Sequence, residues 1–213
     1  MRRFTHAEFD LGALVTAKRG RTVSVCLPAR NEEPTVGAIV ACIRTLTGLV
    51  DEVLVVDDCS TDDTAVVARA AGARVIRGEG LGKGEAMQLA VRESSGDVIA
   101  FCDADVRNFD VGFVLGLVGP LLTTDEVAFV KGYYQRPFEG RPGEGGRVTE
   151  LMARPLLRVL FPHLAGVVQP LGGECAGRRD VFEKVPFVKG WGVDIALVLD
   201  IVARYGAGAL AQV

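Results

Sequence analysis

The sequence predicts an α/β fold with a mostly parallel central sheet and helices on both faces. Short apolar runs rich in β-branched residues alternate four times with amphipathic runs between residues 22 and 102. Strands and helices in alternation form parallel sheets through right-handed crossovers. Polar clusters follow three of these runs, at 28–33, 57–58 and 103–105. Because ligands of such sheets gather at the carboxyl ends of the strands, the same pattern predicts where the site lies.

Apolar periodicity predicts the individual elements. The expected strands are 22–27, which stops at Pro28, then 52–56, 73–76, 97–102, 127–135 and a short strand within 171–178. The expected helices are 34–46, 62–71 with Ser60 or Thr61 as N-cap, a helix from the 78–84 turn to about Ser94, 109–122, 147–160 with a break at Pro155, and 192–204. The first twenty residues are expected to form a surface arm or short helix, and 137–146 a loop.

Composition limits the class of protein. A chain of 213 residues with 49% hydrophobic and 24% charged residues suits one globular domain. The net charge of -3 offers no general attraction for nucleic acid or an anionic membrane, so no nucleic-acid partner is expected. No apolar stretch is long enough to span a bilayer, and no membrane span is expected. The five cysteines form no C-x-x-C pair, which is typical of free thiols in a reducing cytoplasm.

The strongest chemical signal is Asp103-Ala104-Asp105, which follows the apolar run 98–102. Hard divalent cations prefer carboxylate oxygens, and Mg²⁺ uses one or two of them together with substrate phosphates. A metal held in this way would neutralise a departing diphosphate. The alternative is a solvated acidic turn, which D-x-D by itself also fits; its place at the end of a buried strand favours the metal.

Two further acidic clusters follow strands. Residues 60–63 suit the start of a helix, where hydroxyls cap and acids favour the dipole. That leaves Asp57 and Asp58 to accept hydrogen bonds from a base or ribose. The segment 28–33, PARNEE, is either an ordinary loop before a helix or a clasp on a nucleoside.

Two glycine-rich segments suggest anion sites. GEGLGKG at 78–84 fails both the P-loop and the dinucleotide patterns, but it leaves Lys83 at a helix start, where it could meet a diphosphate. At Gly145-Gly146-Arg147-Val148-Thr149, backbone amides, one guanidinium and one hydroxyl could converge on a small anion. A flexible turn with a solvated lysine and an ordinary loop-to-helix turn are the alternatives.

In this order the pieces PARNEE, VVDDCSTDD, GLGKGEA and FCDAD resemble the glycosyltransferases of the GT-A fold (the nucleotide-diphospho-sugar transferase fold). The second half narrows the resemblance. KGYYQRP, GGRVTELMARPLL, QPLGGE and GWGVDIALVLD are similar to the bacterial glucosyl-3-phosphoglycerate synthases and the related mannosyl-3-phosphoglycerate synthases. That family implies retaining transfer of a hexose, with glucose expected, from a nucleotide diphosphate sugar such as UDP-glucose to the hydroxyl of 3-phosphoglycerate, with Mg²⁺ or Mn²⁺.

The resemblance also implies residue roles. The nucleotide sugar would be bound by Pro28, Ala29, Glu32, Asp58, Lys83, Asp103, Ala104, Leu171 and Gly172. The acceptor phosphate would be bound by Gly146, Arg147, Val148 and Thr149, the metal by Asp103 and Asp105, and catalysis would use Asp105, Lys83 and Asp194. Asp194 stands where the family usually has glutamate. The chain would divide into an N-terminal arm (1–21), a nucleotide-sugar-binding half (22–135) and an acceptor-binding half (136–213).

The family pattern raises two further expectations. It implies a homodimer, and it places a metal-binding histidine just beyond Val213, so the C-terminus is expected to be truncated. A nucleotidyltransferase is a competing interpretation, but it would carry an Arg- and Lys-bearing glycine loop where this chain has PARNEE. Mannosyl transfer from GDP-mannose, a different family-2-like transferase and an inactive sugar-nucleotide-binding fragment are also compatible with these motifs.

Overall fold

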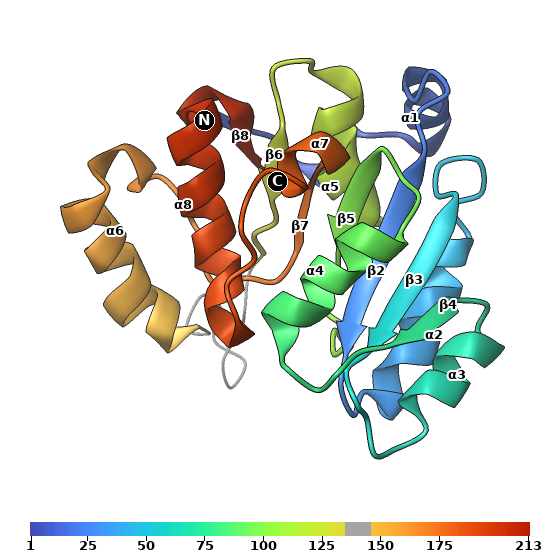
Figure 1. Ribbon diagram of the computed structural model, residues 1–213. Helices are drawn as coiled ribbons and strands as arrows, with labels where there is room; N and C mark the ends of the chain where they lie inside the picture. The colour runs from blue at the N-terminus through green and yellow to red at the C-terminus, as the bar shows by residue number, and fades with distance from the viewer. Residues whose placement is uncertain (135–145) are drawn as a thin grey trace.

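The computed structural model describes residues 1–134 and 146–213, and it places one eight-stranded sheet between helices on both faces (Figure 1). The strands are β1 (Arg2–Arg3), β2 (Val23–Ala29), β3 (Glu52–Asp57), β4 (Arg74–Arg77), β5 (Val98–Phe101), β6 (Phe129–Lys131), β7 (Cys175–Arg178) and β8 (Leu210–Gln212). The α-helices are α1 (Leu11–Ala17), α2 (Glu33–Arg44), α3 (Thr64–Ala70), α4 (Lys83–Glu93), α5 (Val111–Thr123), α6 (Arg154–Leu160), α7 (Arg179–Phe182) and α8 (Val193–Tyr205).

The central strands β2, β3 and β5 form because most of their residues are apolar and the sheet is covered on both faces. Successive side chains point to opposite faces. Val25 and Val55 join a core with α1, α2, α3 and α5, while Cys26 and Leu54 join a second core with α4, α6, α7 and α8. Figure 1 shows α4 in front of the sheet and α6 on the outer side of α8, at the opposite side of the molecule from β4.

The strand order creates the crevice that the sequence predicts. The order is β1-β8-β6-β7-β5-β2-β3-β4, and β7 alone in this order runs antiparallel to its neighbours. From β2 the chain moves outward through β3 and β4, then returns to place β5 on the other side of β2. The connections that follow β2 and β5 therefore run in opposite directions along the sheet, and the carboxyl ends of these two strands form a topological switch point. The mostly parallel sheet with two helical layers confirms the predicted fold class.

Two local predictions are wrong, one about the end of β2 and one about the cap of α3. β2 does not stop at Pro28 but includes it, because β5 pairs with β2 only as far as Cys26 and leaves that edge of β2 unpaired at Pro28. A proline without an N–H is tolerated at such an edge. The expected caps Ser60 and Thr61 do not cap α3: its N-cap is Asp63, and the Thr64 amide donates to Asp62 instead.

The segment after residue 146 begins irregularly. Residues Thr149–Ala153 form a π-helical turn, and α6 then starts with Pro155 in its first turn. Residues 147–160 stay helical, so the kink or break expected at Pro155 is only a change from π-helical to α-helical hydrogen bonding just before the proline, which lacks an N–H. The expected loop at 137–146 lies outside the described residues, except for Gly146, and the strand expected over 127–135 is shorter, since β6 begins at Phe129 and ends at Lys131.

The two ends of the chain meet in the sheet. β1 pairs in parallel with β8, and Leu14 of α1 is 1% exposed. The helix expected in the first twenty residues is present, whereas β1 and β8 are too short to show a periodic pattern. Among the described residues, no helix is both long and apolar enough to cross a membrane.

All five cysteines are free thiols, as expected. Cys26, Cys102 and Cys175 are buried, and burial raises the pKa of the Cys26 and Cys175 thiols to about 12. These thiols therefore pack as small apolar groups.

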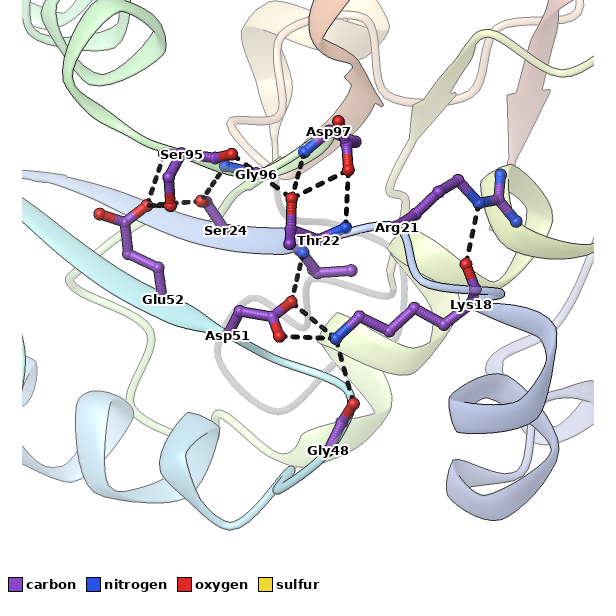
Figure 2. A network of polar contacts seen from close by, with 11 residues as sticks. Lys18, Arg21, Thr22, Ser24, Gly48, Asp51, Glu52, Ser95, Gly96 and Asp97 are labelled. Atoms are coloured by element: carbon purple, nitrogen blue, oxygen red, sulfur yellow. Dashed lines mark hydrogen bonds and ion pairs between the residues drawn. The ribbon is translucent and has the colours of Figure 1, made fainter.

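A polar network fixes the amino ends of the central strands, opposite the crevice (Figure 2). Glu52 accepts hydrogen bonds from the Ser24 hydroxyl at 2.6 Å and the Ser95 amide at 2.8 Å, and it pairs with Arg74. Beside it, Asp51 accepts from the Val23 amide and contacts the Lys18 ammonium at 2.6 Å. These bonds tie the starts of β2 and β3 to the turn before β5.

We predict that Glu52→Gln lowers stability in a pH-dependent way. Burial alone would raise the pKa of Glu52, but hydrogen bonds from Ser24 and Ser95 and the Arg74 charge outweigh it and lower the pKa below its usual 4.5. The carboxylate therefore stabilises the fold above pH 4.5, and its contribution is lost as the pH falls through the lower folded-state value. The free energy of unfolding should drop by on the order of 1 kcal/mol at pH 7.

Urea unfolding between pH 3 and 8 measures this effect. The gap between wild type and Glu52→Gln should narrow below pH 4.5, and the exposed Glu93→Gln serves as the control. A gap that stays constant with pH would show that the ionised carboxylate contributes nothing.

Candidate active site

A pocket opens at the switch point between β2 and β5. Its cavity volume is about 300 Å³. Its walls come from the segments after β2, β3 and β5 and from the start of α4: Pro28, Ala29, Arg30, Glu32, Asp58, Gly82, Lys83, Ala86, Asp103, Ala104, Asp105 and Trp191. Segments far apart in the sequence thus meet at one edge of the sheet. Asp58 and Asp105, which the sequence predicts to share a crevice, line the same pocket.

Asp58 shapes the glycine-rich turn. Its side-chain oxygens accept hydrogen bonds from the Gly80 amide at 2.8 Å and the Gly82 amide at 2.9 Å, and the residue is 5% exposed. Gly82 has φ 110°, a conformation that glycine adopts without strain. Asp58 therefore sets where α4 begins, in addition to lining the pocket.

Gly84, in the first turn of α4, permits a close approach of two backbone segments. A Cβ atom on Gly84 would lie 1.9 Å from the Val188 carbonyl oxygen. Any larger residue would push the start of α4 away from the segment that precedes α8. Gly82 thus serves conformation and Gly84 serves packing.

Lys83 joins three elements at the floor of the site. Its ammonium lies 2.8 Å from Oδ1 of Asp103, after β5, and 3.3 Å from Oδ2 of Asp194, in the first turn of α8. Burial by itself lowers the pKa of Lys83, but the two carboxylates outweigh burial and raise the pKa, so the lysine stays charged. Burial raises the pKa of Asp194, against the charges of Lys131 and Lys83.

Acidic groups gather at the mouth of the pocket. Ala104 is 3% exposed, and its carbonyl accepts a 2.6 Å hydrogen bond from the Thr35 hydroxyl of α2. This contact anchors the middle of the D-A-D segment and leaves Asp105 exposed. The pKa of Glu32 is raised by burial and then by the negative charges of Asp105, Asp62 and Asp103. The mouth therefore carries uncompensated negative charge.

This donor set fits a hard cation. Lys83 contacts Oδ1 of Asp103, which leaves Oδ2 for another partner, and Asp105 presents a second carboxylate. Within residues 1–134 and 146–213, no group of three or more His, Cys, Asp or Glu side chains could hold a metal by itself. A cation here would take its remaining ligands from a substrate, as Mg²⁺ commonly does.

A second pocket of about 360 Å³ continues from the first. It shares Lys83, Asp103, Asp105 and Trp191 with the first pocket and adds Val106, Asn108, Tyr134, Leu171 and Asp194. Leu171 thus lies where the sequence places it, in the wall of a connected cavity. Gly172 is buried, and its carbonyl accepts a hydrogen bond from Lys131.

The predicted acceptor-phosphate residues stand apart from these walls. Gly146, Arg147, Val148 and Thr149 lie at the start of the helical segment that leads to α6, and they line neither pocket. Gly146 has φ 83°, which agrees with the backbone freedom expected there. Gly145 lies outside the described residues.

Sequence reasoning missed two residues of the site. Arg30 lies within PARNEE without a role expected of it, and it lines the first pocket. Trp191 is 81% exposed, and its ring centroid lies 5.8 Å from the Lys83 ammonium. A lone tryptophan between two glycines is a usable signal, because an exposed aromatic ring is a frequent ligand contact.

Comparisons with known proteins agree with this geometry. Residues 24–185 match the model of glycosyl transferase family 2. Glucosyl-3-phosphoglycerate synthase of Mycolicibacterium smegmatis is 50% identical over 94% of this chain and 70% of its own length.

Solved structures of glucosyl-3-phosphoglycerate synthase from Mycobacterium tuberculosis superpose closely. The complex with Mn²⁺, UDP-glucose and phosphoglyceric acid matches with a TM-score of 0.88 and 46% identity, over 96% of this chain and 73% of that one. The complex with Mg²⁺ and UDP matches with a TM-score of 0.91 and 44% identity, over 99% of this chain and 75% of that one. This chain therefore belongs to glycosyl transferase family 2, within the family of the glucosyl-3-phosphoglycerate synthases.

Proposed function

We propose that this chain transfers glucose from UDP-glucose to the hydroxyl of 3-phosphoglycerate, with retention at the anomeric carbon. The M. smegmatis synthase is similar over nearly the whole chain, and the M. tuberculosis synthase was crystallised with both substrates and Mn²⁺. The observation that carries the proposal is the continuity of the two pockets. They share Lys83, Asp103 and Asp105, so one ligand can extend through both with its charged centre at these residues.

The first pocket suits the nucleoside. Pro28 and Ala29 offer an apolar strand end, and Glu32 and Asp58 offer carboxylate oxygens for base or ribose hydrogen bonds. The hydrogen bonds that the Gly80 and Gly82 amides donate to Asp58 hold the glycine-rich turn in place. The start of α4 is therefore preorganised before a ligand arrives.

The shared residues suit the diphosphate. Lys83 is held by two carboxylates and stays charged, so its ammonium can offset the phosphate oxygens without a change in protonation. Asp105 and Asp103 would hold Mg²⁺ or Mn²⁺, which, when bound, stabilises the negative charge that develops on the leaving UDP.

The second pocket suits the sugar and the acceptor. Leu171 and Asp194 line it, Gly172 follows Leu171 in the chain, and Asp194 brings a carboxylate that can accept hydrogen bonds from sugar hydroxyls. Gly146, Arg147, Val148 and Thr149 would hold the acceptor phosphate through amides, a guanidinium and a hydroxyl. A homodimer remains a prediction from the family resemblance, and a cytoplasmic location remains a prediction from the free cysteines.

A donor-by-acceptor panel on the full-length protein tests the proposed function. UDP-glucose, GDP-glucose and GDP-mannose are each incubated with 3-phosphoglycerate or glycerate and Mg²⁺ or Mn²⁺, and released nucleoside diphosphate is measured. UDP-glucose with 3-phosphoglycerate should give the highest kcat/KM, and chelation by EDTA should abolish turnover. Turnover of GDP-mannose alone would assign mannosyl transfer instead. Release of pyrophosphate would indicate a nucleotidyltransferase, and binding without turnover a sugar-nucleotide-binding protein.

We predict that Arg147→Ala raises the KM for 3-phosphoglycerate on the order of tenfold to a hundredfold, because a charge-assisted hydrogen bond contributes about 1.5–3 kcal/mol. The dissociation constant of UDP, measured by calorimetry, should stay within about twofold. Arg158→Ala is the matched control, since Arg158 is an exposed arginine of α6. If the affinities for both substrates fall together, or neither moves, Arg147 does not bind the acceptor.

We predict that Asp58→Asn weakens UDP binding on the order of tenfold. The amide group that replaces one carboxylate oxygen is a donor, and it would face the backbone N–H of Gly80 or Gly82. The glycine turn would lose a charge-assisted bond and with it the fixed start of α4. Calorimetric titration with UDP measures the change, and Asp63→Asn, an exposed neighbour without a side-chain cap bond, is the control. Unchanged UDP affinity would exclude Asp58 from the nucleotide site.

A further inference from the structure

Lys131 is a buried lysine outside the pocket walls. It is the last residue of β6, and its backbone pairs with β7 on one side and β8 on the other. Its exposed fraction is 1%. Burial of a charged group is costly unless polar or charged neighbours compensate for it. The polar and charged groups that compensate for the buried charge of Lys131 therefore indicate the role of its side chain.

The first compensating group belongs to the wall of the second pocket. The Lys131 ammonium donates a hydrogen bond to the carbonyl oxygen of Gly172. Leu171, the preceding residue, lines the second pocket. Gly173, the following residue, lies so close to Asp103 that an added Cβ would be 2.0 Å from Oδ1. Lys131 thus ties the sheet to a loop that contacts the sugar pocket and Asp103 together.

The second compensating group is Asp194. Burial raises the pKa of Asp194, and the charge of Lys131 is the largest influence in the opposite direction, ahead of that of Lys83. Asp194 is 4% exposed, and its Oδ1 has no hydrogen-bond partner among the described residues. Lys83 contacts the other oxygen, Oδ2. Asp194 therefore lies in the field of two ammonium groups, one at the pocket and one behind it.

Asp194 lies in the field of both Lys83 and Lys131, and Glu174, which is 1% exposed, is a further buried carboxylate close to Gly172. With Lys131 removed, Asp103 and Asp194 would share the single ammonium of Lys83.

We propose that Lys131 is a positioning residue for the sugar end of the donor: its buried ammonium holds the Gly172 carbonyl and balances the charge of Asp194. This inference rests on the proposed function, since it assigns the second pocket to the sugar. Lys131 touches no substrate in this arrangement. It acts through the loop that contains Leu171 and Gly172 and through Asp194.

The first experiment compares two ligands that differ by the sugar. Lys131→Met keeps the volume of the side chain and removes its charge and donor. Calorimetry on the full-length protein should show UDP-glucose affinity reduced on the order of tenfold, with UDP affinity within about twofold of wild type, in line with the loss of one buried polar contact. The control is Ser24→Ala, a buried polar residue at the opposite end of the sheet, where both affinities should stay at the wild-type level.

The second experiment requires no turnover or ligand. A double-mutant cycle combines Lys131→Met with Asp194→Asn, and urea unfolding measures each variant. Because the Asn carries no charge to balance, Lys131→Met should raise the unfolding equilibrium constant less in the Asp194→Asn background, by a factor on the order of ten. Should Lys131→Met fail to fold, Lys131→Gln removes the charge alone, and its cycle with Asp194→Asn tests the charge balance by the same measurement.

The results of these experiments distinguish a failure of the role of Lys131 from a failure of the proposed function. Equal losses of UDP and UDP-glucose affinity, or additive effects in the cycle, would overturn the role of Lys131. If the wild type turns over none of the donor and acceptor pairs but the cycle shows coupling, the proposed function fails and the charge balance between Lys131 and Asp194 stands.

Discussion

The ammonium of Lys83 lies where three parts of the chain meet, and the arrangement of the site depends on its two ion pairs. Lys83 begins α4, and it contacts Asp103 after β5 and Asp194 at the start of α8. Buried charges are stable together when each has a partner, and removal of one leaves the others uncompensated. Lys83 thus couples the parallel half of the sheet, where a nucleotide binds in such folds, to the later helices that close the second pocket.

Close backbone approaches make this ion cluster possible. Gly84 lets α4 touch the segment before α8, and Gly173 lets the loop after residue 170 reach Asp103. Asp58 holds the turn before α4 through two amides, and Thr35 holds the carbonyl of Ala104. Each of these contacts fixes an element end rather than an element interior. The carboxylates are therefore preorganised by the scaffold, as electrostatic stabilisation of a leaving group requires.

Elements with strong periodic patterns could be predicted from the sequence, and short ones could not. The alternation of apolar strands with the α2 and α4 helices was clear, because burial of both sheet faces demands it. β1 and β8 have two and three residues and carry no period. The strand boundary at Pro28 was missed because the end of β5, far away in sequence, decides whether β2 needs an N–H at that position. The α3 cap was missed because several hydroxyls and acids in a row compete for the same role.

The sequence by itself determined the fold class, the acidic strand ends and the lysine at a helix start, because hydrophobic period and strand-end position are local properties. It also carried the family through motifs that are each contiguous in the chain, although they are spread from residue 28 to residue 200. Tertiary structure alone decided that Asp58 directs its oxygens to the glycine turn, that Trp191 and Arg30 reach the pocket, and that Lys131 lies behind Asp194. These facts depend on distances between residues remote in sequence, and burial and charge pairing are properties of the folded chain rather than of any one segment.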